Sequence, residues 1–291
     1  MILREALQST TQTLCRAGIA DASVEAELLL GYVLGMSKTQ IYTEPERSLT
    51  SVETEHLRHL VRRRLDHEPA AYILGHCEFY GIDFYIDHHT FIPRPETELL
   101  VEKAVELAQR ISHHHQREQI TIADIGTGCG AIAISLALAL PQVKIYATDV
   151  SAAALQVAEI NCRRHGVNSQ VKLLQGNLLE PLPQPVDMIV ANLPYIKGCE
   201  FKDLSPEIRD YEPTMALAGG EDGLDRIKQM LEQMPGKLSY GACFFLEIGQ
   251  GQGEMVTSLI KSYFPEVSIE LISDLGGIER LVKVVFQEGV K

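Results

Sequence analysis

Short apolar runs and helical segments alternate along the chain from Ile120 onward, and this alternation limits the possible folds most strongly. The runs expected as strands are residues 120–125, 143–148, 171–174, 186–191, 243–248, 267–272 and 280–286. The segments expected as helices between them include residues 129–140, 152–165 and 223–233. Such alternation requires a mainly parallel sheet that is covered by helices on both faces. The sequence therefore predicts an α/β fold.

A different pattern precedes the alternation. Apolar residues recur at helical spacing over residues 3–18 and 22–34, and a third helix is expected from Thr50, whose hydroxyl forms a capping box with Glu53. Residues 1–70 are therefore predicted to form a small helical bundle. Alternating residues near Phe79 predict a β-hairpin within a linker over residues 71–92, before a large domain over residues 93–291.

The large domain opens with Pro93-Arg94-Pro95-Glu96. Pro95 suits the first turn of a helix, and the acidic side chain of Glu96 is stabilised by the helix dipole there. We expect this helix to run to about Gln109. A well-made helix start does not explain Arg94, which is expected to be exposed.

The strand expected at residues 186–191 runs directly into Asn192-Leu193-Pro194-Tyr195. Pro194 ends the strand, which places this tetrapeptide at the carboxyl edge of the sheet, where α/β proteins bind ligands. The Asn192 side-chain oxygen and the Leu193 carbonyl can each accept one hydrogen of a planar NH2 group, while Tyr195 covers its flat face. A polar turn followed by an aromatic plug is the alternative interpretation.

A glycine-rich turn connects the strand at residues 120–125 to the next helix, with the sequence Asp124-Ile125-Gly126-Thr127-Gly128-Cys129-Gly130-Ala131. Glycines let a ligand lie against the backbone at a helix N-terminus. Asp149 follows the next strand, where its carboxylate can accept both hydroxyls of a ribose. The same glycines satisfy a dinucleotide fingerprint, so NAD stays an alternative to a nucleoside cofactor with an ammonium group beside Asp124.

Charge and cysteine usage exclude several classes of protein. The formal net charge of −13 gives no general attraction to nucleic acid, and Arg62-Arg63-Arg64 is expected to be the solvated face of a helix. The six cysteines form no Cys-x-x-Cys pair, which predicts a reduced, cytoplasmic chain with no zinc site. Residues 113–115, three histidines, are expected in an exposed loop, and no metal site is predicted. No stretch is apolar enough for a membrane span.

These motifs together resemble the class I S-adenosylmethionine-dependent methyltransferases and, among them, the peptide chain release factor glutamine methyltransferases. The resemblance extends over nearly the whole chain. The additional matching segments are Tyr72-Ile73-Leu74-Gly75, Ile92-Pro93-Arg94-Pro95-Glu96-Thr97-Glu98, Tyr211-Glu212-Pro213, Ala216-Leu217, Gly219-Gly220, Asp222-Gly223-Leu224, Glu247-Ile248-Gly249 with Gln252, and Asp274-Leu275-Gly276 with Arg280.

The resemblance implies a Rossmann-like sheet of seven strands with the last strand antiparallel, and an N-terminal bundle that binds the substrate protein. It implies S-adenosyl-L-methionine as cofactor, S-adenosyl-L-homocysteine as product, and a class I release factor as partner, methylated on the glutamine of its Gly-Gly-Gln loop. The residues implied to bind the cofactor are Asp124, Gly126, Thr127, Gly128, Cys129, Gly130, Asp149, Asn177, Leu178 and Asn192. Those implied to bind the substrate are Arg94, Glu96 and the catalytic tetrapeptide Asn192, Leu193, Pro194 and Tyr195.

This chain departs from the family pattern at two positions. Asn177-Leu178 stands where the family usually has Asp-Trp, which replaces a carboxylate acceptor near the adenine by an amide. Leu193 stands where the family usually has Pro, but the acceptor needed there is a backbone carbonyl, which Leu also has. We expect the enzyme to be a monomer that does not bind nucleic acid or membranes.

Two other functions fit parts of the pattern. An adenine methyltransferase acting on DNA needs the same two acceptors and stacking ring, but it also needs a basic groove for a flipped base. A nucleoside-binding module without catalytic activity needs only the glycine-rich turn and Asp149. The acidic charge balance disfavours the DNA methyltransferase. A nucleoside-binding module would bind the cofactor without transferring its methyl group.

Overall fold

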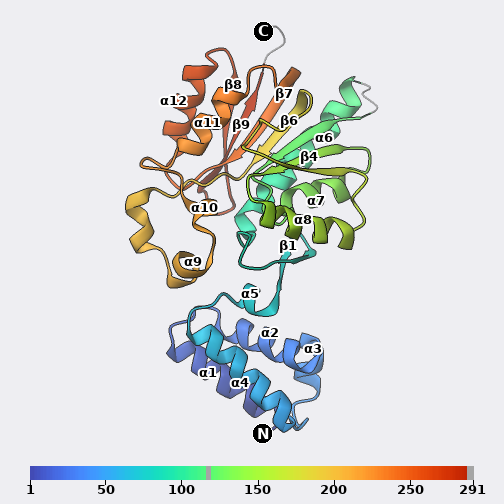
Figure 1. The fold of residues 1–291 in the computed structure, drawn as a ribbon. Coiled ribbons are helices and arrows are strands. Elements are labelled where there is room, and N and C mark those ends of the chain that lie inside the picture. The colour runs from blue at the N-terminus through green and yellow to red at the C-terminus, as the bar shows by residue number, and fades with distance from the viewer. Residues whose placement is uncertain (116–118, 287–291) are drawn as a thin grey trace. The chain divides into compact units, whose positions relative to one another are not determined.

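The computed structural model describes residues 1–115 and 119–286 (Figure 1). These residues divide into two compact units. The first contains Met1–His76 together with Ser205–Tyr211, and the second contains Cys77–Leu204 and the chain from Glu212 onward. Nothing in the sequence of Ser205–Tyr211 indicates that this segment belongs to the N-terminal unit.

The N-terminal unit is a helical bundle, as the periodicity predicts. Its helices are α1 (Leu3–Arg16), α2 (Ala22–Leu34), α3 (Lys38–Thr43), α4 (Ser51–Leu65), α5 (Ala70–Leu74) and α9 (Pro206–Tyr211). The capping box at α4 is confirmed, because the Thr50 side chain accepts from the Glu53 backbone N–H while the Glu53 carboxylate accepts from the Thr50 backbone N–H at 2.7 Å.

The arginine triplet on α4 is only partly solvated, so the expectation that it forms an exposed face is wrong for Arg64. Arg64 is 1% exposed, and its guanidinium bonds the carboxylates of Glu25 on α2 and Glu207 on α9. A buried guanidinium needs such partners, because an unpaired charge in the interior is strongly unfavourable. These two ion pairs connect Ser205–Tyr211 to the rest of the bundle.

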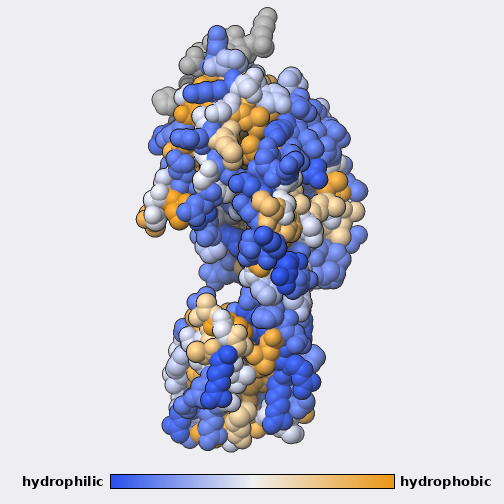
Figure 2. Space-filling model, turned by 90° about the vertical axis from the view of Figure 1, so that its left-hand side faces the viewer, coloured by the Kyte–Doolittle hydropathy of each residue, from blue (hydrophilic) through white to orange (hydrophobic). Residues whose placement is uncertain are grey.

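Apolar side chains also reach the surface of the N-terminal unit, as the orange atoms in the lower part of Figure 2 show. On α2, Val24, Leu28 and Tyr32 are 46–48% exposed. Their spacing of four residues places them on one face of the helix. These three side chains therefore form an exposed apolar stripe on the surface of the bundle.

The junction between the units differs from its expected form in two places. Residues 71–74 are helical, within α5, and the hairpin of β1 (His76–Phe79) and β2 (Ile82–Tyr85) begins after them. After the hairpin, a 3-10 turn η1 (Pro95–Thr97) leads into α6 (Glu98–His115), which extends beyond Gln109. The three histidines at 113–115 are thus in a helix and not in a loop.

The second unit is built on a seven-stranded sheet with the order β5-β4-β3-β6-β7-β9-β8. Its strands are β3 (Thr121–Ile125), β4 (Lys144–Asp149), β5 (Val171–Gln175), β6 (Val186–Ala191), β7 (Leu238–Glu247), β8 (Ser268–Ser273) and β9 (Glu279–Val285). The last strand, β9, is antiparallel to both neighbours, which confirms the predicted sheet.

The remaining elements of the unit are α7 (Ala131–Ala139), α8 (Ala152–Arg164), η2 (Gly198–Asp203), α10 (Thr214–Leu217), α11 (Asp225–Gln233) and α12 (Gly253–Tyr263). Helices flank this sheet on both sides, with α11 and α12 on one side and α6, α7 and α8 on the other (Figure 1). The central strands β3 and β6 are buried on both faces, as expected of parallel strands between helices. None of the described helices is long and apolar enough to cross a membrane.

Candidate active site

Asn192 follows directly after β6, at the carboxyl edge of the sheet, and is half-buried. Its side-chain Nδ2 donates to the hydroxyl of Thr97 at 3.1 Å. An amide that donates through its nitrogen on one side presents its oxygen on the other. The contact with Thr97, at the end of η1, was not predicted from sequence, because 95 residues separate the two side chains.

Leu193 and Tyr195 are held tightly in the same turn. Leu193 is 2% exposed, and its side chain packs beside Gly126 of the glycine-rich turn. The backbone of Tyr195 lies against Gly219 and Gly223 so closely that a Cβ at either position would approach within 3.0 Å. Burial raises the pKa of the Tyr195 hydroxyl to about 12, so the ring is neutral at ordinary pH.

A glutamine completes the packing around Tyr195. The Gln252 side chain donates to the Tyr195 carbonyl at 3.2 Å and accepts from the Gly249 backbone N–H at 2.8 Å. Gly249 itself leaves space for the ring, since a Cβ there would lie 3.0 Å from the Tyr195 Cδ2. These glycines therefore leave the space that Tyr195 occupies.

Arg94 is less exposed than the sequence predicts. Its guanidinium pairs with the carboxylate of Glu212 and lies over the ring of Phe91, with Cζ 4.7 Å from the ring centroid. Glu212 is buried and also accepts from the Ile92 backbone N–H at 3.2 Å. Arg94 thus links the start of the large domain to the segment after α9, and Glu96 beside it is exposed.

The glycine-rich turn joins β3 to α7. Gly126, Gly128 and Gly130 all have positive φ, which other residues adopt with strain. Asp124 beneath them is fully buried, and one of its oxygens accepts from the Thr127 hydroxyl at 2.6 Å. Its other oxygen, Oδ1, has no hydrogen-bond partner within residues 1–115 and 119–286. Burial raises the Asp124 pKa to about 7.

Asp149 ends β4 and faces the same turn. Its carboxylate accepts from the backbone N–H of Gly128 at 2.9 Å and of Ser151 at 2.8 Å. Burial raises its pKa, and these backbone donors oppose the shift. Each oxygen of a carboxylate can accept a second hydrogen bond, so the group retains capacity for a ligand hydroxyl.

Asn177 and Leu178 follow β5 at the same edge of the sheet. Asn177 donates to the Glu180 carboxylate at 3.2 Å. Leu178 has φ of 51°, a left-handed conformation that is uncommon outside glycine, and its carbonyl accepts from the buried Thr148 hydroxyl at 2.9 Å. This fixed turn leaves the two residues beside the end of β4.

Glu247, the last residue of β7, also lies at this site, although no role for it was predicted from the sequence. Glu247 is 4% exposed, and its Oε2 has no hydrogen-bond partner in the described part of the chain. Burial raises its pKa to about 7, against smaller opposing effects from the neighbouring Thr97 and Asn192 side chains. An acid ending an otherwise apolar strand was the signal that could have identified it.

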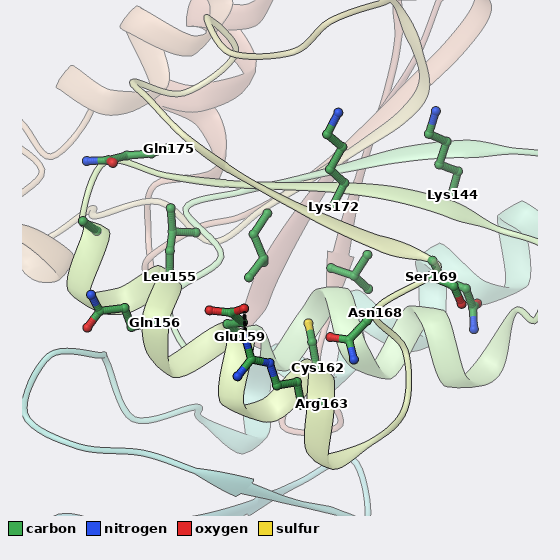
Figure 3. Close-up of a pocket in the computed structure, with 14 residues that line it drawn as sticks. Lys144, Leu155, Gln156, Glu159, Cys162, Arg163, Asn168, Ser169, Lys172 and Gln175 are labelled. Atoms are coloured by element: carbon green, nitrogen blue, oxygen red, sulfur yellow. Dashed lines mark hydrogen bonds and ion pairs between the residues drawn. The ribbon is translucent and has the colours of Figure 1, made fainter.

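A hollow of about 790 Å³ lies elsewhere, along α8 and the edge strand β5 (Figure 3). Its lining includes Lys144, Lys172 and Arg163, and Arg163 is paired with Glu159. The predicted site residues do not line it. The carboxyl edge of the sheet, where the polar groups converge, is therefore the candidate active site.

Comparison with known proteins agrees with this architecture. The family model described as the PrmC N-terminal domain matches residues 5–75, and the methyltransferase small domain matches residues 101–208. A solved methyltransferase from Pyrococcus furiosus is similar in fold, with a TM-score of 0.51, 18% identity, and coverage of 80% of this chain and 98% of that one.

Two curated relatives align with nearly the entire chain. The release factor glutamine methyltransferase of Koribacter versatilis is 37% identical over 284 residues, covering 97% of this chain and 98% of that protein. The release factor glutamine methyltransferase of Moorella thermoacetica is 37% identical over 281 residues, covering 96% and 97%. The likeness thus includes the N-terminal unit as well as the sheet.

Proposed function

Because the chain belongs to the release factor glutamine methyltransferase family, we propose that it methylates the glutamine of the Gly-Gly-Gln loop in class I peptide chain release factors with S-adenosyl-L-methionine. Membership of the family makes the chain a glutamine methyltransferase that acts on release factors.

The contact between Asn192 and Thr97 is the observation that carries the proposal. Because Nδ2 donates to Thr97, the Asn192 oxygen is available to accept a hydrogen from a substrate NH2 group. The Leu193 carbonyl accepts the second hydrogen. The Tyr195 ring, which is neutral and packed against glycines, covers the flat face of the amide.

These contacts suit the chemistry of an amide nitrogen, whose lone pair is delocalised and weakly nucleophilic. Two acceptors on its hydrogens increase the electron density on nitrogen and hold it in one orientation. Pro194 fixes the backbone between the acceptor residues and the ring. The proton leaves after the nitrogen becomes cationic, and a strong base is not needed before attack.

The residues around the glycine-rich turn fit S-adenosyl-L-methionine. When bound, this cofactor supplies an electrophilic methyl group and is converted to S-adenosyl-L-homocysteine. The partnerless Oδ1 of buried Asp124 suits an ammonium group, and positive-φ glycines let a ligand approach the backbone. Asp149, oriented by two backbone N–H groups, holds the ribose hydroxyls, and Asn177-Leu178 lie by the adenine.

The apolar stripe of Val24, Leu28 and Tyr32 supports a role for residues 1–70 in binding the substrate protein. Residues 71–92 link this domain to the methyltransferase domain, residues 93–291, where Arg94 and Glu96 contribute to the substrate side of the site. A cytoplasmic, monomeric enzyme that does not bind nucleic acid directly is part of the proposal.

Incubation with labelled S-adenosyl-L-methionine and a purified class I release factor, followed by mass mapping, tests this function. We expect one methyl group on the glutamine of the Gly-Gly-Gln loop. A release factor with glutamate at that position is the matched control and should stay unlabelled. Label on nucleic acid alone, or on another residue of the release factor, would contradict the proposal.

A further inference from the structure

Glu247 is a buried acid beside the proposed acceptor of the substrate amide. The register pairs Ala191 at the end of β6 with Leu246 of the parallel strand β7. The next residues along the two strands are Asn192 and Glu247, which therefore lie side by side at the carboxyl edge of the sheet. A carboxyl group with an unpartnered oxygen is unfavourable in a core, so a purely structural role explains Glu247 poorly.

The hydrogen-bonding capacity of the three side chains determines how they must be connected. Thr97 is buried and has one hydroxyl proton, and its oxygen accepts from the Asn192 Nδ2 at 3.1 Å. An ionised carboxylate accepts but does not donate. The Thr97 proton and the Asn192 NH2 group are therefore both directed at Glu247, which leaves the Asn192 oxygen for the open side of the turn.

We propose that Glu247 is a positioning residue that, together with Thr97, holds the Asn192 amide in the orientation that presents its oxygen to the substrate NH2. The nature of that substrate rests on the proposed function. Rotation of the amide by half a turn would present Nδ2 instead, and two NH2 groups cannot hydrogen-bond each other in that geometry. Glu247 disfavours this rotation because it has no proton to offer to the amide oxygen.

The charge of Glu247 makes this orientation depend on pH. Exposed Glu96 of η1 raises the Glu247 pKa, Arg280 of β9 lowers it, and the neutral Tyr195 ring also faces the group, but burial is the largest effect. With a pKa of about 7, the carboxylate is ionised above that pH and acts only as an acceptor. Below it, a protonated Glu247 can donate, and the amide loses its unique orientation.

Kinetic comparison of Glu247→Gln with the wild-type enzyme tests the proposal. A glutamine has a similar shape but can donate as well as accept, so we expect kcat to fall about tenfold to a hundredfold at pH 8 with little change in KM. The decrease in wild-type kcat below about pH 7 should be absent from this variant. Glu254→Gln, which removes an exposed carboxylate from α12, is the matched control and should behave as the wild type.

A second pair of variants tests the hydroxyl. Thr97→Val has nearly the same shape but no hydroxyl, so it should reduce kcat by a similar factor, and Thr97→Ser should restore most of the lost rate. Thermal unfolding of each variant establishes that it is folded. Equal kcat values in Thr97→Val and Thr97→Ser, or a wild-type kcat in Glu247→Gln at pH 8, would overturn the proposal.

A measurement on the enzyme alone separates this proposal from the proposed function. The Asn192 side-chain NH2 signal can be recognised by nitrogen NMR as the one that Asn192→Ala removes. We expect its protons to exchange with water about tenfold faster in Thr97→Val and Glu247→Gln than in the wild type. Equal exchange would refute the positioning role even if the release factor is methylated. If the Asn192 NH2 protons exchange slowly in the wild type but the release factor is not methylated, only the proposed substrate is refuted.

Discussion

Gly219 lies so close to Tyr195 that a Cβ on the glycine would stand 2.7 Å from the Tyr195 Cα. This contact explains why a glycine is required after α10, where the backbone does not need a positive φ. Two of the atoms that would clash, the Tyr195 Cα and carbonyl carbon, belong to the backbone of the proposed substrate-binding turn, and the third is the Gly223 Cα. A shift of the Tyr195 backbone would also move its ring.

The first prediction follows from this contact. Gly219→Ala should displace the Tyr195 backbone, lower the free energy of unfolding by about 1–3 kcal/mol, and reduce kcat more than it reduces cofactor affinity. Chemical denaturation and steady-state kinetics measure both effects. Gly198→Ala is the control, because a Cβ there meets no described atom closer than 3.9 Å. Equal effects of the two substitutions would show that the close contact is unimportant.

The strands and glycine-rich turn could be predicted because their signals are local. The strand at Val186–Ala191 was predicted at its observed bounds, since an apolar run ending at Asn192 and Pro194 marks both the strand and its end. The capping box of Thr50 and Glu53 needs only a spacing of three residues. In such cases, the residues that determine the structure are neighbours in sequence.

Contacts between distant segments could not be predicted in this way. Arg94 was expected to be exposed because its partner, Glu212, is 118 residues away and has no matching local pattern. Arg64 was assigned to a solvated face for the same reason, since Glu25 and Glu207 lie on other helices. The role we infer for Glu247 likewise depends on the pairing of β6 with β7, which the sequence does not state.

Asp149 is the subject of the second prediction. Asp149→Ala should weaken S-adenosyl-L-methionine binding by about 1–3 kcal/mol, because hydrogen bonds from the ribose hydroxyls to a charged acceptor are lost. Loss of the bond from the Gly128 N–H would also loosen the glycine-rich turn. Calorimetry measures the affinity, and Glu270→Ala, on β8 with its partner Lys283, removes the same charge at the far edge of the sheet. If folded Asp149→Ala binds S-adenosyl-L-methionine with unchanged affinity, other groups hold the ribose.

Asp124 gives a prediction about stability and pH. Its pKa is raised by burial from 3.8 to about 7 in the folded chain, so the fold retains a proton that the unfolded chain has already lost. The ionised form is therefore disfavoured in the fold, and this carboxyl destabilises the protein increasingly as pH rises from about 4 to about 7. Below pH 3.8 the effect disappears.

Asp124→Asn removes this titration while keeping an oxygen for the Thr127 hydroxyl and the Ala133 N–H. Relative to the wild type, its free energy of unfolding should increase by on the order of 1–4 kcal/mol between pH 4 and pH 7. Denaturant unfolding across this range measures the difference. Asp222→Asn is the control with the opposite sign, because Lys228 lowers the Asp222 pKa. A pH-independent difference for Asp124→Asn would mean that the buried carboxyl is already ionised in the fold.

Asn192 provides the decisive test of the proposed substrate contacts. Its amide is held by Thr97 and is proposed to accept one hydrogen of the substrate NH2, so it should act in orientation and not in folding. Asn192→Asp is a poor test, because it keeps an acceptor and adds a charge that attracts the sulfonium. Asn192→Ala removes the acceptor and should lower the methyl-transfer rate about 100-fold or more, while cofactor affinity changes by less than about tenfold.

Single-turnover kinetics and calorimetry on the same Asn192→Ala preparation separate these two quantities. Asn168→Ala removes an exposed amide that lines the hollow beside α8, and it should leave both quantities unchanged. The rate should fall more than the cofactor affinity, because the amide hydrogens become more acidic in the transition state. Loss of their acceptor therefore affects the transition state more than it affects the bound cofactor. If Asn192→Ala binds cofactor and methylates the release factor at nearly the wild-type rate, the substrate amide is not held at this turn, and the proposed roles of Leu193 and Tyr195 lose their basis as well.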